Sequence, residues 1–519
     1  MQSPTNCIRR AMVGSNLIAP CPACSKCSLR IIWPKAMVRV RKWQGRFREE
    51  SDGALRESKM FRYISIAAAL LVATTAQAQP QDAKLRAERD LFAKIVEIPT
   101  VEGQTAEFKK LTALLTAEFR KAGINNVVVK DHDGTQTLIA RWPAEKPSGK
   151  KPILLMAHMD VVAAKESDWK YPPFKFREEG GYYLGRGSND NKAGLTGILI
   201  ALQYLRAEKF QTTRDIIVLF TGDEETSGNG SRRAGTEWRA LIDAEYALNS
   251  DAGGGSVFPD GRVEAFGMQI AEKTYADYKL TATNRGGHSS VPRPDNAIYA
   301  LANALTSLEH HRFEPMINDA TRATFAALAK GDNGQYGELL KRFLADPKDR
   351  ETADLLEAMD SGSTRTRCVA TMLSGGHAPN ALPQKAEATV NCRIFPGVKI
   401  EDVRQILQKL SGPDVTVTAV EGSQTPETSP TPLRDDIIDA YRAAVATRFK
   451  DAPVIPFQSA GATDGAFLRA QGIPVYGFGG LWGIVGQSEG THGLNERVWT
   501  EGFHGQIPIW MEMLKRVAG

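Results

Sequence analysis

The sequence predicts a three-layer α/β/α fold that carries an inserted, smaller α+β domain of the ferredoxin-like type. Apolar, strand-like runs alternate with helical segments between residues 84 and 250, which is typical of a sheet covered by helices on both faces. Near Lys273 the order changes to strand–helix–strand–strand–helix–strand, the ferredoxin-like order. After residue 422 the α/β pattern returns, which indicates that the smaller domain interrupts the larger one.

The elements of the larger domain follow from periodicity and from breaking residues. Apolar residues at helical spacing, stopped by Pro99 and Gly123, predict the first two helices, and continuous apolar runs predict buried strands. The expected helices cover 84–98, 106–122, 192–207, 434–448 and 501–517. The expected strands cover 126–130, 137–142, 153–159, 215–221, 246–250 and 474–478.

The smaller domain is expected at 273–422, between two parts of the larger domain at 79–272 and 423–519. Its strands are expected at 277–283, 364–372, 386–393 and 415–420, and its helices at 296–308 and 400–410. A polar helical insertion, roughly Arg312 to Met359, interrupts this order.

A secretory signal peptide is predicted at 60–78. An arginine precedes an apolar stretch at 64–75, and Ala-Gln-Ala at 76–78 is a small-x-small cleavage site, so Gln79 would begin the mature chain. The stretch is short for a membrane span. Because a signal opens a protein, we interpret residues 1–59 as an upstream extension from a misplaced start codon; a genuine extra segment is the alternative. The mature protein is therefore expected to be secreted, in the periplasm, and free of the membrane.

Composition argues against nucleic-acid binding. The chain of 519 residues is 42% hydrophobic and 24% charged, as in ordinary soluble proteins. Its formal net charge is only +5, and many of the basic residues lie within 1–59. The remainder has no basic stripe with interleaved aromatic residues, so we expect no nucleic-acid partner.

Six cysteines divide between the extension and the body of the chain. The CPACSKC run in the extension lacks a well-spaced fourth ligand for a metal site. The spacing of Cys368 and Cys392 suits neighbouring strands, and export would permit a disulfide between them. Two buried free thiols are an equally good interpretation.

Five short segments place histidines or acids at or just after expected strand ends, where open α/β sheets hold their sites. They are AHMD at 157–160, GRGSNDNKAG at 185–194, FTGDEETSG at 220–228, NSDAGGG at 249–255 and EGTHGLNERV at 489–498. Singly, each has a plain structural interpretation, such as a helix N-cap for Asp190. Packing like charges at a strand end is costly, however, unless cations or protons offset them.

Together, these two histidines and three carboxylates match a two-metal hydrolase. His158 and Asp160 are two residues apart, so both side chains leave the strand end on one face. A carboxylate commonly holds the second nitrogen of a histidine ligand and fixes its tautomer. Imidazole and carboxylate ligands favour two Zn²⁺ ions, with Co²⁺ or Mn²⁺ as alternatives.

The run HMDVV–W–PPF–GRG–D–K and the DEE after a strand resemble the zinc-dependent aminoacylase, glutamate carboxypeptidase and dipeptidase family, over roughly 91–517. The resemblance implies five metal ligands. His158 and Asp251 would hold one ion, Glu225 and His492 the other, and Asp190 would bridge both.

The same resemblance makes Glu224 the general base and Asp160 the residue that orients His158. Adjacent side chains diverge, so Glu224 is free to take a water proton and pass it to the leaving nitrogen. Asn191 stands where the family more usually has a second acid, and we expect little effect on metal binding.

The smaller domain would supply substrate contacts. His288, in NRGGHSSVP, matches a histidine that donates to the oxyanion and, in dimeric members, reaches the partner subunit's site. Arg393 matches an arginine suited to a substrate carboxylate, Asn380 an asparagine that contacts the substrate, and Gly461 a glycine that lines the pocket. The smaller domain is therefore expected to act as a lid and dimerisation domain. The insertion resembles the longer aminoacylase- and carboxypeptidase-like branch and leaves the oligomeric state open.

These inferences predict an exopeptidase, carboxypeptidase-like, that cleaves the amide or peptide bond of short peptides or N-acyl amino acids. An N-acyl-amino-acid amidohydrolase (aminoacylase) is the alternative. A non-catalytic binding member would have lost Glu224 or a ligand, and none is missing. A two-metal phosphoesterase is expected to carry phosphate-binding basic residues beside the metals, and we find no such cluster.

Overall fold

The computed structural model describes residues 82–359 and 362–519. The signal peptide expected at 60–78, the extension at 1–59 and its cysteine run lie outside the described residues. Within the described ranges, no helix is both long enough and apolar enough to cross a membrane.

A mixed ten-stranded sheet forms the centre of the larger part, which confirms the predicted mixed α/β class. Its strands run in the order β1-β2-β6-β3-β7-β17-β9-β8-β18, and β16 pairs with β9. The middle strands β6, β3, β7 and β17 are parallel, whereas β1, β2 and β6 are joined antiparallel. The bounds are β1 Asn126–His132, β2 Thr135–Trp142, β3 Ile153–His158, β6 Ile216–Thr221, β7 Tyr246–Asn249, β8 Gly254–Val257, β9 Val263–Glu272, β16 Val454–Ser459, β17 Val475–Phe478 and β18 Trp482–Ile484.

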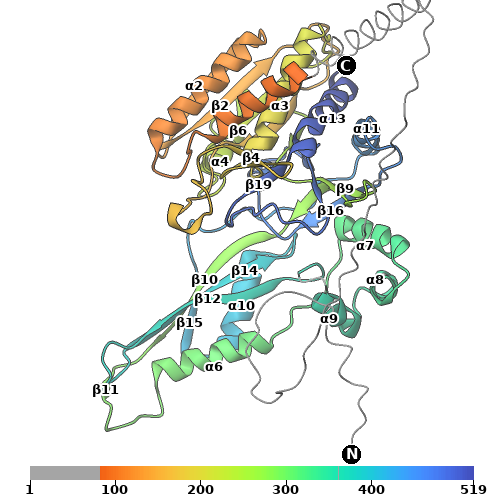
Figure 1. The fold of residues 1–519 in the computed structure, drawn as a ribbon. Helices are drawn as coiled ribbons and strands as arrows, with labels where there is room; N and C mark the ends of the chain where they lie inside the picture. The colour runs from red at the N-terminus through yellow and green to blue at the C-terminus, as the bar shows by residue number, and fades with distance from the viewer. Residues whose placement is uncertain (1–81, 360–361) are drawn as a thin grey trace, which may run out of the picture. The chain divides into compact units, whose positions relative to one another are not determined.

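Helices cover both faces of this sheet, because its middle strands are apolar on both sides. Every residue of β3 and β6 is buried, as expected for parallel strands under two helical layers. Ile153 and Leu155 pack into one core cluster, whereas Leu154 and Met156 pack into another on the opposite face. The first face carries α2, α3, α11 and α13 (Figure 1), and the second carries α4, α5 and α12. The bounds are α2 Thr105–Lys121, α3 Lys192–Ala207, α4 Asn229–Gly235, α5 Arg239–Ile242, α11 Asp435–Ala446, α12 Gly465–Ala470 and α13 Thr500–Ala518.

A separate four-stranded antiparallel sheet follows β9, in the order β12-β14-β10-β15. Its elements follow one another as β10 Thr274–Thr283, α6 Ala297–His310, β12 Arg367–Gly375, β14 Lys385–Ile394, α10 Ile400–Ser411 and β15 Val415–Ala419. Buried residues alternate along β14, and they pack with apolar residues of α6 and α10. One face of this sheet is therefore covered by helices, and β12 forms an edge.

The polar insertion consists of three helices, α7 Asp319–Gly331, α8 Gln335–Ala345 and α9 Arg350–Met359. They bury a small core of their own that includes Phe325, Leu340 and Phe343. The insertion also contacts β16, since the Thr324 hydroxyl donates to the carbonyl of Pro456 at 2.8 Å.

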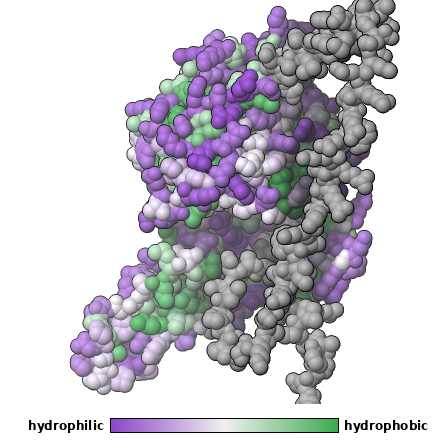
Figure 2. Space-filling view, in the orientation of Figure 1, coloured by the Kyte–Doolittle hydropathy of each residue, from purple (hydrophilic) through white to green (hydrophobic). Residues whose placement is uncertain are grey.

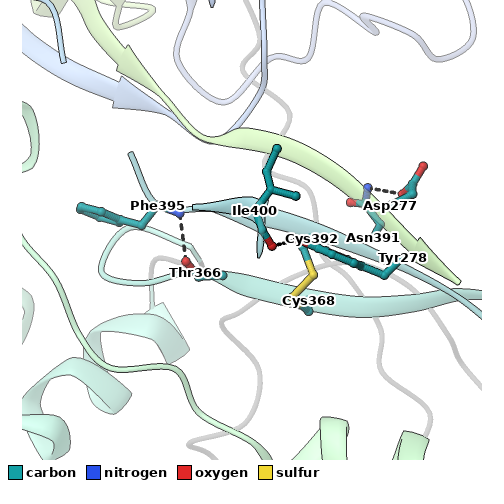
Figure 3. The surroundings of a disulfide bond; sticks show 8 residues. All are labelled: Asp277, Tyr278, Thr366, Cys368, Asn391, Cys392, Phe395 and Ile400. Carbon is teal, nitrogen blue, oxygen red and sulfur yellow. Dashed lines mark hydrogen bonds between the residues drawn. A yellow bond between two sulfur atoms is a disulfide. The ribbon is translucent and has the colours of Figure 1, made fainter. Parts of the chain in front are cut away.

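Cys368 and Cys392 form a disulfide between directly opposed residues of β12 and β14 (Figure 3). Of the two interpretations left open by the sequence, the structure has the bonded one. The bridge lies beside the hydrogen bond from the amide of Phe395 to the Thr366 hydroxyl, so the start of β12 is tied to the end of β14 at two points.

Several strands were not expected from the sequence, and most of them are short. These are β8, β9, β16, β18 and a small sheet of β4 Arg177–Glu179, β5 Tyr182–Leu184 and β19 Arg497–Trp499. Strands of three or four residues carry too little periodicity to stand out. The longer β9 contains a glycine at 267, which weakens a strand pattern.

Candidate active site

The predicted ligands converge because three of them end on neighbouring parallel strands. His158 is the last residue of β3, Glu225 follows β6, and Asp251 follows β7. Since β6, β3 and β7 lie side by side in parallel, their carboxyl ends share one edge of the sheet. Asp190 lies just before α3, and His492 lies in the loop between β18 and β19.

The first group of candidate ligands contains His158, Asp190 and Asp251. The Nε2 atom of His158 lies 2.8 Å from Asp190 Oδ1 and 3.3 Å from Asp251 Oδ1. Each of the three residues offers one ligand atom, and these atoms lie within 4.8 Å of one another. The imidazole is buried, whereas both carboxylates are partly open to solvent.

The second group contains Glu225, His492 and, again, Asp190. The Nε2 atom of His492 lies 2.9 Å from Glu225 Oε2 and 3.2 Å from Asp190 Oδ2. Asp190 therefore presents one carboxylate oxygen to each group, which is the arrangement of a bridging ligand. His492 is half exposed and takes a positive φ of 55°, in a loop rich in glycine.

Glu224 lies near residues of both groups, but unlike Glu225 it is not among the residues that contact His492. It forms a third set of close donor atoms with His158 and Glu225. Burial raises the pKa of Glu224 well above its usual range, and the carboxylates of Asp251 and Asp464 raise it further. A carboxylate with a raised pKa is a stronger base than an exposed one, which suits a proton-transferring group.

Asp160 contacts one residue of each ligand group. Its Oδ1 lies 3.4 Å from His158 Nδ1, and its backbone carbonyl lies 3.1 Å from the same nitrogen. Its Oδ2 accepts a hydrogen bond of 2.9 Å from the backbone amide of Glu225. One side chain thus restrains a histidine of the first group and the backbone of the second.

Charge explains why this cluster requires cations. Four carboxylates and two imidazoles gather here, and burial raises the pKa of Glu225. Hydrogen bonds that its imidazole donates to the carboxylates of Asp190 and Glu225 raise the pKa of His492 to about 10. The carboxylates of this cluster attract positive charge, and divalent cations would supply it. Imidazole and carboxylate donors at this separation fit zinc, cobalt or manganese.

Two buried residues that the sequence analysis did not single out hold the loop of Asp190. Glu496 Oε1 accepts hydrogen bonds from the backbone amides of Asn189 and Asp190, at 2.8 and 2.9 Å. Its Oε2 pairs with Arg186 Nη1 at 2.7 Å, and both side chains are almost fully buried. The signal was present, because Arg186 belongs to the GRG motif and Glu496 to the NERV segment.

Asn191 has a definite part in the site. Its side-chain amide donates to Asp251 Oδ1 at 2.9 Å and accepts from the Ser250 hydroxyl at 3.1 Å. An asparagine at this position therefore orients the Asp251 ligand without adding another negative charge to the cluster.

The four residues expected to contact substrate lie outside the ligand groups, and of these His288 and Asn380 are close to each other. His288, on β11 Gly287–His288, pairs with Ala381 of β13 Ala381–Leu382, next to Asn380. Arg393 lies on β14 with its guanidinium 4.7 Å from the ring centroid of Tyr275. Gly461 follows β16 in an exposed loop. Within the described ranges, no hydrogen bond or ion pair joins these four residues to the ligand groups.

A cavity of about 510 Å³ opens beside the ligands. Its lining includes Asp190, Asn191 and Asp251, together with Trp482 from β18. The ligand groups thus border a space large enough for a small molecule.

Comparison with known proteins adds to this geometry. The model for "Peptidase family M20/M25/M40" matches residues 154–516. The human N-fatty-acyl-amino acid synthase/hydrolase PM20D1 is 26% identical over 462 residues, covering 83% of this chain and 87% of that one. The probable carboxypeptidase S-like 2 of Dictyostelium discoideum is 26% identical over 422 residues, which is 79% of either chain.

Solved structures show the same fold. The M20 family metallo-carboxypeptidase Sso-CP2 from Sulfolobus solfataricus has a TM-score of 0.62 and 21% identity, covering 82% of this chain and 98% of that chain. The di-peptidase Dug1p from Saccharomyces cerevisiae has a TM-score of 0.60 and 15% identity, covering 84% and 97%. The family match spans all five candidate ligands, and the chain therefore belongs to peptidase family M20/M25/M40, a family of metal-dependent hydrolases.

Proposed function

We propose that this protein hydrolyses the amide or peptide bond of short peptides or N-acyl amino acids with two Zn²⁺ ions. His158 and Asp251 would hold one ion, Glu225 and His492 the other, and Asp190 both. The observation that carries this proposal is the division of the Asp190 oxygens between the two ligand groups, at 2.8 and 3.2 Å from their histidines. Co²⁺ and Mn²⁺ fit the same donors.

When bound, the two ions would lower the pKa of a water and polarise the scissile carbonyl. Glu224 would take a proton from the attacking water and give it to the leaving nitrogen, so one carboxylate would serve first as base and then as acid. Asp160 keeps His158 in the tautomer that leaves Nε2 free to ligate. Asn191 and Glu496 hold the Asp251 side chain and the Asp190 backbone in place.

Substrate would be held by residues outside the metal groups. Arg393 would bind the substrate carboxylate, since a guanidinium matches a carboxylate with two hydrogen bonds. Asn380 and the backbone at Gly461 would contact the remainder of the substrate. His288 would donate to the oxyanion, supplied either by movement of its own hairpin or by a second subunit.

Relatives' names include both a carboxypeptidase and an N-fatty-acyl-amino acid synthase/hydrolase. We propose an exopeptidase of carboxypeptidase type, with an N-acyl-amino-acid amidohydrolase as the second candidate. A non-catalytic role is disfavoured because Glu224 and all five ligands are present and converge.

We also propose that the segment 273–422 is a lid and dimerisation domain between catalytic parts at 79–272 and 423–519. Its edge strand β12 exposes Val369, Met372 and Leu373 to between 60% and 70%. Figure 2 shows hydrophobic surface gathered in the lower part of the view, where Figure 1 places the β10–β12–β14 sheet and α6. An exposed apolar edge strand is a template for pairing, and a second copy of this chain would present the same strand.

Light scattering tests this dimer proposal. The parent protein should have the mass of two chains, and a Met372→Lys, Leu373→Lys double variant should have the mass of one. A monomeric parent would contradict the proposal.

Export to the periplasm is proposed from the signal-like segment at 60–78 and from the Cys368–Cys392 disulfide, since disulfides persist in oxidising compartments. Fractionation of cells that express the full chain tests this. The mature protein should appear in the periplasmic fraction with Gln79 as its first residue.

An activity screen tests the main proposal. Protein beginning at Gln79 is loaded with zinc and offered dipeptides and N-acyl amino acids, with and without a chelator. We expect turnover that the chelator abolishes and zinc restores, with two metal ions per chain by elemental analysis. Metal-loaded protein that turns over none of these substrates would overturn the proposal.

A further inference from the structure

His492 differs from the other candidate ligands in how it is held. Its side chain is 56% exposed, whereas the side chains of the other four ligands are between 1% and 19% exposed. It lies in the loop between β18 and β19, with a positive φ of 55° that is uncommon for residues other than glycine. Since His492 lies on neither a strand nor a helix, contacts from other segments fix its position.

The guanidinium of Arg186 makes the buried contact to this loop. Its Nη2 donates to the backbone carbonyl of Gly493, the residue after His492, at 2.9 Å. Its Nη1 pairs with Glu496 Oε2 at 2.7 Å, and the side chains of Arg186 and Glu496 are only 3% and 1% exposed. One planar guanidinium thus holds the His492 loop at two positions, which a single ammonium group does not do with the same geometry.

Arg186 is itself firmly placed. Its backbone amide donates to the carbonyl of Pro173 at 2.7 Å. Its guanidinium carbon lies 4.9 Å from the centroid of the Trp169 ring, within the range of a cation–π contact. Two segments outside the His492 loop therefore fix the group that holds this loop.

The same pair of side chains also reaches the bridging ligand. Glu496 Oε1 accepts from the backbone amides of Asn189 and Asp190, at 2.8 and 2.9 Å. Arg186 and Glu496 therefore join the loop of Asp190 to the loop of His492. In the part of the chain that the structure describes, Arg186 makes no hydrogen bond or ion pair with His158 or Asp251, which follow strands of the buried sheet.

We infer that Arg186 is a positioning residue for the second metal ion, because it holds His492 where Nε2 meets Glu225 and Asp190. The inference rests on the proposed two-ion function. Without the bond to the Gly493 carbonyl, His492 would leave this position, and the second ion would lose its only nitrogen ligand. The first ion would keep His158 and Asp251.

Arg186→Lys tests this role, since lysine keeps a positive charge beside Glu496 but lacks the planar fork. Competition with a chelator measures the affinity for each ion, and elemental analysis gives the number bound. We expect the Kd of the second ion to rise by about 10- to 100-fold, the usual effect of losing a group that orients a metal ligand. The Kd of the first ion should not change.

Co²⁺ identifies which ion is affected. At one equivalent of Co²⁺, the visible absorption of Arg186→Lys should match that of His492→Ala, which lacks the second histidine. A second equivalent should change the spectrum of the parent and leave that of the variant unchanged. A variant spectrum that follows the parent through both equivalents would overturn the inference.

Arg469→Lys is the matched control. Arg469 forms an ion pair with Glu272 in which the two side chains are also 3% and 1% exposed, and its Nη1 donates to the backbone carbonyl of Val475 at 3.1 Å. Val475 lies on β17, which carries no candidate ligand. Stability should fall in both lysine variants, but Arg469→Lys should bind two ions as tightly as the parent. Equal weakening of the second ion in the two variants would reduce Arg186 to a structural residue.

A double variant keeps the test available should Arg186→Lys not fold. Arg186→Met with Glu496→Gln removes both charges, so no unpaired charge is left buried. It should also lose affinity for the second ion, and parent-like affinity would contradict the inference.

Metal affinity is measured without turnover, which separates this inference from the proposed function. A parent that binds two ions but hydrolyses no peptide or N-acyl amino acid would overturn the proposed reaction and leave Arg186 to be judged by its variants. A parent that binds fewer than two ions would overturn both proposals.

Discussion

The edge of the central sheet and the inserted four-stranded unit differ in how they position their candidate functional residues. At the central edge, the candidate ligands form sets of three whose ligand atoms lie within 4.8 Å of one another, and they stand on a core in which β3 and β6 are fully buried. In the inserted unit, His288, Arg393 and Asn380 occupy a hairpin tip, a strand face and a loop. The first region brings its candidate ligands together through neighbouring strand ends and through loops held by buried contacts, whereas the residues expected to contact substrate in the second lie on elements that make no hydrogen bond or ion pair with those ligands within the described ranges.

This difference predicts that changes at the central edge affect catalysis most. Glu224→Gln should lower kcat by about 10²- to 10⁴-fold, because the amide cannot accept the water proton. Two metal ions should remain bound, since the proposed ligands are untouched. Steady-state kinetics and elemental analysis of the same sample measure both effects. If the variant is as active as its parent, Glu224 is not the general base.

The next largest effect is expected from the buried pair of Glu496 and Arg186, which holds the Asp190 loop. Glu496→Gln breaks a buried ion pair with Arg186 and weakens the acceptor for the amides of Asn189 and Asp190. We expect the free energy of unfolding to fall by about 3–5 kcal/mol, because an unpaired charge is left buried. Urea unfolding measures this change.

An exposed ion pair supplies the control. Arg442 and Asp439 are 2.9 Å apart with both side chains more than half exposed. Arg442→Ala should change the free energy of unfolding by about 1 kcal/mol or less. Equal losses in the two variants would show that Glu496 contributes no more than a surface residue does.

In the inserted unit, loss of the disulfide should lower the stability of the protein without changing its metal content. Replacing Cys368 and Cys392 with serine removes a crosslink between residues 24 apart in sequence and should lower stability by about 3 kcal/mol. Metal content should not change, because no ligand lies on β12 or β14. Thermal unfolding and elemental analysis test the two statements independently. Loss of metal from the double variant would show that the two regions are coupled.

The sequence predicted secondary-structure elements correctly where the apolar pattern extends over many residues. The helix expected at 192–207 is α3 with the same bounds, the strand expected at 215–221 ends at Thr221 as predicted, and the strand expected at 153–159 ends one residue earlier, at His158. It reached the ligand set because each ligand follows such a strand or opens such a helix. Short strands such as β18 were missed, since three residues carry no period.

Contacts between distant segments could not be predicted from the sequence. Glu496 holds Asp190 across 306 positions, and no local pattern specifies such a pairing. The same holds for Arg186, whose bond to the Gly493 carbonyl spans 307 positions. Motifs identified which residues carry the chemistry, and packing determined which residues support them.

Asp160 gives the smallest expected effect and the sharpest test of how the central edge works. Asp160→Asn keeps the size of the side chain, but it weakens the contact with His158 Nδ1 and changes the acceptor for the Glu225 amide. Metal affinity should fall by about 10- to 100-fold, because a histidine ligand loses the carboxylate that fixes its tautomer. Competition with a zinc chelator measures this affinity. Since Asp160 touches both groups, the two ions should be released together; stepwise release would show that Asp190 alone joins them.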